Sequence, residues 1–151
     1  MVGNSVTTLS AGIPTYPLTI SLFGSFQVTL QGKPLTDFRS NKGRALLAYL
    51  VMAKQKPVAR TTLTDLLWQN YQPNSARTNL RQVLSNLREI LAPLDLIRSD
   101  YQTIQLTLDP AVVWCDVLAF DELIDACQRH SHVTLAHCPL CQARLQQATA
   151  L

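Results

Sequence analysis

The stretch 75-SARTNLRQVLSNLREIL-91 has the periodicity of an amphipathic helix, and it determines the fold that we predict. At about 100° per residue, its apolar side chains fall within one stripe narrower than about 100°. These side chains are Ala76, Leu80, Val83, Leu84, Leu87 and Leu91. We expect a helix over about 75–91 whose apolar stripe faces the core.

The opposite side of this helix is polar and basic. It carries Arg77, Arg81 and Arg88 in a row, Thr78, Gln82 and Ser85 outermost, Asn79 and Asn86 on the other flank, and the acidic residue Glu89. A merely solvated helix commonly mixes Glu with Lys to gain i,i+4 pairs. Arg instead matches guanine edges or phosphates, and Asn and Gln match adenine edges. The composition therefore favours a DNA-reading face over a solvated one.

The segments around this helix predict a small α+β domain. Residues 18–30 alternate apolar and polar, and Gln31-Gly32 turns the chain toward 33–35, which indicates an antiparallel sheet. A first helix is expected from Ser40 or Asn41 to just before 54-KQKP-57, and a second over 62–70. After the 75–91 helix, residues 96–108 have the pattern of a β-hairpin.

Two short helices, a long polar-faced helix and a basic hairpin follow one another in the order of a winged helix-turn-helix. In that arrangement the third helix enters the major groove, and the hairpin reaches the neighbouring backbone or minor groove. The expected backbone contacts are Lys42, Arg44 and Arg60, which lie near helix starts, and Arg98 in the hairpin.

The ordered motifs resemble the DNA-binding domain of SARP-type regulators, whose OmpR/PhoB-type winged helix precedes a bacterial transcriptional activator domain. The resemblance covers roughly 18–125 and rests on LFGSFQVTLQGKPL, NKGRALLAYLVM, RTTLTDLLWQN, NSARTNLRQVLSNLREIL and IQLTL…WCDVLAFDEL. It implies a transcriptional activator that binds repeated promoter elements, with homodimers on such repeats, and that helps to recruit RNA polymerase. The hairpin departs from the family pattern, because Ser99-Asp100-Tyr101 stands where many relatives have a glycine-rich turn, and Asp100 would repel phosphate.

The charge is divided unevenly along the chain. The net charge is +3, but residues 31–99 hold eleven of the thirteen Lys and Arg and only four of the ten Asp and Glu, a local net of +7. This split indicates a polyanion-facing surface in the middle segment. A hydrophobic content of 47% and a charged content of 15% argue against a disordered chain.

The composition also bears on location and domain organisation. The longest apolar run, 45–53, is too short to span a bilayer, and the N-terminus lacks the pattern of a signal peptide, so we expect a cytoplasmic protein without membrane contact. We predict a flexible arm over 1–17, the winged-helix domain over 18–113, and helices over 114–151 that begin an incomplete helical-repeat activator domain. The last predicted helix has no stop signal, so we expect the chain to be cut from a longer protein.

The segment 127-CQRHSHVTLAHCPLC-141 concentrates potential metal ligands. Cys138 and Cys141 have the spacing of two zinc thiolates, and Cys127 with His130 or His132 could complete a tetrahedron, with His137 beside the second cysteine pair. A structural zinc ion is therefore a hypothesis, although no cofactor is required for DNA binding. The alternatives are buried or incidental cysteines in a reducing compartment, and a redox CxxC, which lacks the expected βαβ context. Cys115 is expected in the core.

The sequence contains no phosphate loop, nucleophile elbow or paired carboxylates in an apolar setting, so we expect a non-enzymatic protein. The predicted function is sequence-specific binding of double-stranded promoter DNA. The alternative is a winged helix used for protein interaction or dimerisation, whose binding would depend far less on salt.

Overall fold

A computed structural model describes residues 16–151. The described residues form an α+β structure with five α-helices, two short 3-10 helices and seven strands in two sheets. Residues 1–15 of the predicted N-terminal arm lie outside the described part. None of the helices in that part is both long and apolar enough to cross a membrane.

The first sheet has the strand order β3–β2–β1–β7. Its strands are β1 (Leu18–Ser21), β2 (Gln27–Leu30), β3 (Lys33–Pro34) and β7 (Val113–Cys115). β1 pairs antiparallel with β2 and parallel with β7, so that Leu18 lies opposite both Leu30 and Val113. The predicted domain boundary at 113/114 thus falls inside a strand of this sheet, because the sequence pattern did not show the parallel pairing of β1 with β7.

Three helices follow in the predicted order: α1 (Asn41–Met52), α2 (Arg60–Leu67) and α3 (Pro73–Ile90). α3 begins two residues before the predicted start, with Pro73 at its first position, where the missing N–H costs nothing. Its predicted apolar stripe is buried apart from the half-buried Val83. α1 and α3 approach closely at Gly43, where an added Cβ would lie 3.8 Å from Cγ1 of Val83.

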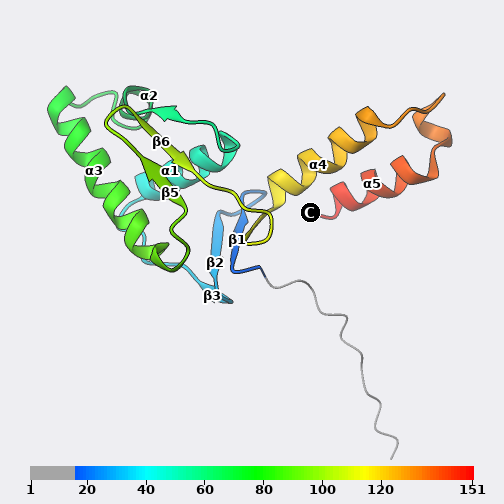
Figure 1. Cartoon of the computed structure of the whole chain (residues 1–151), viewed down its shortest axis with the longest axis horizontal. Helices are drawn as coiled ribbons and strands as arrows, with labels where there is room; N and C mark the ends of the chain where they lie inside the picture. The colour runs from blue at the N-terminus through cyan, green and yellow to red at the C-terminus, as the bar shows by residue number, and fades with distance from the viewer. Residues whose placement is uncertain (1–15) are drawn as a thin grey trace, which may run out of the picture.

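The second sheet has the order β4–β6–β5 and contains the predicted hairpin. Its strands are β4 (Val58–Ala59), β5 (Ile97–Ser99) and β6 (Thr103–Leu106). β4 lies in the predicted link before α2, and it pairs Val58 with Ile104. The link therefore attaches the hairpin to the helices, and Figure 1 shows β5 and β6 beside α1 and α3.

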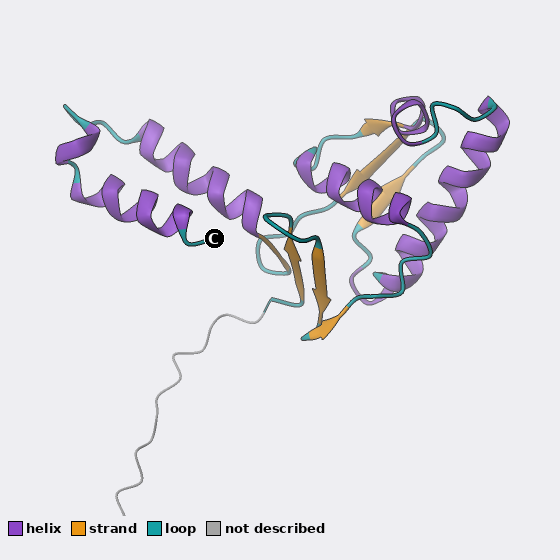
Figure 2. Ribbon diagram, turned by 180° about the vertical axis from the view of Figure 1, so that it is seen from behind, coloured by secondary structure: helices purple, strands orange, loops and turns teal. Residues whose placement is uncertain are grey.

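The remaining helices, α4 (Asp116–Arg129) and α5 (Pro139–Thr149), form an antiparallel pair that projects from the first sheet (Figure 2). Between them lies a 3-10 turn, η2 (Leu135–His137), and another, η1 (Ala92–Leu94), follows α3. The main core runs from Leu18 to Cys115, which is buried as expected. A separate small core between α4 and α5 contains Cys127, Cys138 and Cys141.

Asp116 joins α4 to the first sheet. It is the first residue of α4 and is only 2% exposed. Its carboxylate accepts hydrogen bonds from the backbone N–H groups of Leu22 (2.9 Å), Phe23 (3.0 Å) and Val117 (2.7 Å). The loop after β1 and the start of α4 are thus held by one buried charged group.

Candidate nucleic-acid interface

α3 exposes most of the polar residues that the helical pattern assigned to its outer face. Asn79 is half-buried, and the exposed residues are Arg77, Thr78, Arg81, Gln82, Ser85 and Arg88. The hydroxyl of Thr78 donates to the carbonyl of Asn74 at 3.0 Å. Glu89 forms an ion pair with Arg39 at 3.0 Å, which offsets its charge at the C-terminal end of the helix.

Asn86 does not belong to this exposed face, which corrects its prediction as a base-contacting residue. Its side chain is 4% exposed. Its Oδ1 accepts the backbone N–H of Arg39 at 3.1 Å, and its Nδ2 donates to the carbonyl of Asp37 at 3.4 Å. Asn86 therefore fixes the loop before α1, and its amide groups are already used within the protein.

The β5–β6 hairpin is tied to α2 and α3 by arginines. Arg60, at the start of α2, donates from Nε to the carbonyl of Asp100 at 2.9 Å and from its backbone N–H to the carbonyl of Gln102 at 2.8 Å. Arg88 on α3 donates to the hydroxyl of Ser99. These bonds hold the hairpin tip beside the N-terminal part of α2.

Asp100 builds the turn of the hairpin. Its carboxylate accepts the backbone N–H groups of Gln102 (2.7 Å) and Thr103 (2.6 Å) and the Thr103 hydroxyl (3.1 Å). The hydrogen bonds from the backbone of Thr103 and Gln102 lower the pKa of Asp100. The charge that was expected to repel phosphate is thus turned toward the backbone of the hairpin itself.

A groove separates the N-terminal half of α3 from the hairpin tip, and it is basic. Arg60, Arg77 and Arg81 line it together with the hairpin residues Tyr101 and Gln102. Burial, followed by the nearby charges of Arg88 and Arg81, lowers the pKa of Arg60. The mutual repulsion among these arginines favours an anion in or beside the groove.

Three of the expected contacts to the DNA backbone, Lys42, Arg44 and Arg98, have different surroundings. Lys42 donates from Nζ to the carbonyl of Leu67 at the end of α2. Arg44 lies with its guanidinium 5.7 Å from the ring centroid of Phe38 and bonds Asn41 Oδ1 at 3.3 Å. Arg98 is exposed on β5, and none of these three residues lines the α3–hairpin groove.

Tyr101 belongs to this surface but was absent from the predicted interface residues, and Arg60 was expected only as a phosphate contact near a helix start. Tyr101 is 85% exposed at the hairpin tip, an unusual position for an aromatic side chain. The sequence signal that could have identified Tyr101 is an aromatic residue within a predicted turn. The position of Arg60 beside the hairpin could not be predicted, because it depends on the pairing of β4 with β6.

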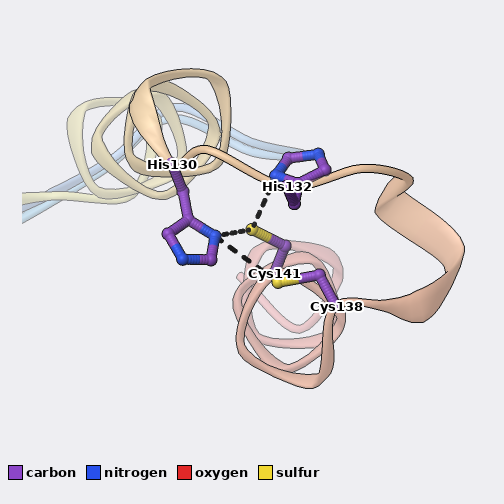
Figure 3. Close-up of side chains that lie close together, drawn as sticks. All are labelled: His130, His132, Cys138 and Cys141. Atoms are coloured by element: carbon purple, nitrogen blue, oxygen red, sulfur yellow. Dashed lines mark hydrogen bonds between the residues drawn. The ribbon is translucent and has the colours of Figure 1, made fainter.

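The Cys/His segment forms a second cluster, at the end of the α4–α5 pair (Figure 3). One ligand atom each of His130, His132, Cys138 and Cys141 lies within 4.8 Å of the others. Cys127, which the sequence pattern included, is outside this group; its Sγ lies 3.7 Å from the carbonyl oxygen of Cys141. The exposed His137 is also outside and contacts the Thr134 hydroxyl through Nδ1 at 2.7 Å.

Comparison with known proteins finds similarity to a transcriptional regulator. The chain is 36% identical over 74 residues to the transcriptional regulatory protein EmbR of Mycobacterium tuberculosis and of Mycobacterium bovis. This chain is similar to EmbR. The alignment covers 49% of the chain and 19% of EmbR, and no protein-family model matches.

The likeness to EmbR extends to the fold. A structure of M. tuberculosis EmbR in complex with a low-affinity phosphopeptide superposes with a TM-score of 0.68 at 25% identity, covering 90% of this chain and 36% of that one. The superposed part is therefore about a third of the EmbR chain. EmbR is a transcriptional regulator, which supports the expectation of a non-enzymatic protein.

Proposed function

We propose that the chain binds double-stranded DNA in a sequence-specific manner as part of a bacterial transcriptional regulator, with α3 in the major groove. The observation that carries this proposal is the row Arg77–Arg81 on the exposed side of α3, which lines a groove shared with Arg60. Arg forks pair with guanine edges, and Thr78, Gln82 and Ser85 add donors and acceptors of a size that suits bases or phosphates.

In this proposal α2 and α3 form a helix-turn-helix, and the β5–β6 hairpin is the wing of an OmpR/PhoB-type winged helix. The hairpin tip would approach the phosphate backbone or the minor groove beside the major-groove contact of α3. The exposed Tyr101 at the tip offers an aromatic ring, and Arg98 offers a charge. Because the Asp100 carboxylate faces its own turn, the hairpin is a better candidate for this contact than its sequence indicated.

The similarity to EmbR supports the wider assignment to a SARP-type regulator. A chain of this type would act in the cytoplasm as an activator, on repeated promoter elements, as a homodimer on such repeats, and with RNA polymerase as partner. α4 and α5 would begin the helical activator domain.

The salt dependence of binding tests this function. Duplex DNA binding, followed by fluorescence anisotropy over a range of salt concentrations, should weaken steeply, with a slope of about −0.9 per phosphate neutralised. Lys42→Ala should weaken binding to all sequences alike and reduce the slope by about one. Affinity for DNA that is negligible even at low salt would overturn the proposal.

A protein-interaction or dimerisation module is the alternative. The exposed apolar side chains of Leu66 (49%) and Tyr71 (55%), at the α2–α3 connection, are the observation in its favour. An apolar protein contact would persist at high salt, whereas DNA binding would not. Sedimentation analysis of the chain with and without DNA at high salt separates the two.

A further inference from the structure

We propose that His130, His132, Cys138 and Cys141 form a tetrahedral structural zinc site that joins the end of α4 to the start of α5. The site is separate from the proposed DNA contacts, since the loop between α4 and α5 lies at the end of this pair away from α3 (Figure 1).

The distances among the ligand atoms match such a site. The Nδ1 of His130 lies 3.2 Å from Sγ of Cys141 and 3.4 Å from Sγ of Cys138, and the Nδ1 of His132 lies 4.0 Å from Sγ of Cys141. Zn–S bonds of about 2.3 Å and Zn–N bonds of about 2.0–2.1 Å in a tetrahedron separate sulfur and nitrogen by about 3.6 Å. The three observed separations lie on either side of this value, and all four ligand atoms lie within 4.8 Å of one another, so small adjustments would let them bind one zinc ion.

The local backbone presents the two cysteines together. Cys138 is the N-cap of α5 and Cys141 lies in its first turn, so both sulfurs stand at the positive end of the helix dipole. His130 is the C-cap of α4, directly after its last residue Arg129, and His132 follows in the loop. The ligands thus come from both helices, and a bound ion would fix how the two helices meet.

The charge of the proposed site also balances. Zinc would displace a proton from each of the two thiols, and two thiolates with two neutral imidazoles leave a complex with no net charge. Cys138 and Cys141 are buried, and a neutral complex avoids the large cost of burying an isolated charge. Because four protein ligands fill the tetrahedron, the site would be structural and not catalytic.

The composition of the small core explains why a metal would be useful there. The buried residues of this cluster are Cys127, Cys138 and Cys141, with Leu145 packed against them. Few large apolar side chains are available to hold the two helices together, and small cores of this kind commonly need a disulfide or a metal. A disulfide between Cys138 and Cys141 would use both thiols within α5 and leave α4 unconnected.

The first experiment measures zinc in the purified full chain, after removal of any affinity tag, by elemental analysis. The proposal predicts one zinc ion per chain. Replacement by Co²⁺ should give the intense d–d absorption of tetrahedral coordination together with a thiolate-to-cobalt charge-transfer band. A chain that contains no zinc and gives no such spectrum when Co²⁺ is added to the reduced apoprotein would overturn it. An intact mass lower by two hydrogens in the freshly purified protein, with peptide mapping that places the disulfide at Cys138–Cys141, would do the same.

Matched variants test the ligand set. His130→Ala and Cys138→Ser should lose most of the zinc, while His137→Ala and Cys127→Ser should retain it, because His137 and Cys127 lie outside the four-atom group. If Cys127→Ser loses zinc as completely as Cys138→Ser, the assignment of these four ligands is wrong. Circular dichroism of each variant separates loss of a ligand from loss of folding, and the cobalt spectrum of the wild-type chain remains decisive if a variant does not fold.

Metal removal distinguishes this inference from the proposed function. Chelation should increase hydrogen exchange in α4, α5 and the loop between them, while α1–α3 stay protected and DNA affinity is unchanged. Equal loss of protection throughout the described residues would contradict a site confined to this pair of helices.

Discussion

Arg60, the first residue of α2, donates a hydrogen bond from Nε to the carbonyl of Asp100 at the tip of the β5–β6 hairpin, over 2.9 Å. The two residues are 40 positions apart, and the bond lies at the edge of the groove that also contains Arg77 and Arg81. One side chain therefore contributes to the charge of the proposed DNA surface and to the position of the hairpin.

Two substitutions of Arg60 should separate these contributions. Arg60→Lys keeps the charge, so the salt slope of DNA binding should stay unchanged, whereas Arg60→Met should reduce the slope by about one. Both variants lose the guanidinium bond to Asp100 and should increase hydrogen exchange at the hairpin tip. Anisotropy titrations at several salt concentrations measure the slope. An unchanged slope for Arg60→Met would show that Arg60 does not contact phosphate.

Asn86 should affect stability and not sequence preference. Because its buried amide bonds the backbone of Asp37 and Arg39, Asn86→Ala should lower the free energy of unfolding by about 1–3 kcal/mol. Urea denaturation measures this loss, and binding assays well below the melting temperature should show the wild-type sequence preference. Gln82→Ala, on the exposed face of the same helix, is the matched control and should leave stability nearly unchanged. A changed base preference in a folded Asn86→Ala protein would contradict the structural assignment.

Asp116 should be important for joining α4 to the first sheet. Asp116→Ala removes the acceptor of the Leu22, Phe23 and Val117 N–H groups, and we expect a loss of about 3 kcal/mol, as for buried bonds to a charged group. Chemical denaturation checks the magnitude. Asp125→Ala, on the exposed side of α4, should change stability by less than about 0.5 kcal/mol. Equal effects of the two substitutions would mean that the Asp116 network contributes little.

Local patterns predicted much of this fold. The apolar stripe of α3, the strand alternation of β1 and β2 and the Gln31-Gly32 turn were all visible because each depends on neighbouring residues. Gln31 and Gly32 both have positive φ (49° and 77°), as a tight hairpin turn requires. The observed boundaries of these elements differ from the predicted ones by only a few residues.

Interactions between distant positions could not be predicted in the same way. The parallel pairing of Leu18 with Val113 and the bonds from Leu22 to Asp116 join segments more than 90 residues apart. The helical periodicity predicts that Asn86 lies on a polar flank of α3. Asn86 is buried because the loop around Arg39 packs over it. The Cys/His pattern indicated five candidate ligands, and only the packing of α4 against α5 shows that Cys127 lies outside the group of four.

The most direct test of the central claim selects bound sequences from random duplex DNA with the wild-type chain and with Arg81→Ala, each at two salt concentrations. Losing an arginine that is bidentate to guanine costs about 1–3 kcal/mol and relaxes one base pair. For the wild-type chain we predict an enriched motif that is repeated at about one helical turn, roughly 10.5 base pairs. In Arg81→Ala this motif should lose its preference at one position. The absence of any enriched motif, with weak binding that disappears at moderate salt, would contradict sequence-specific reading by α3.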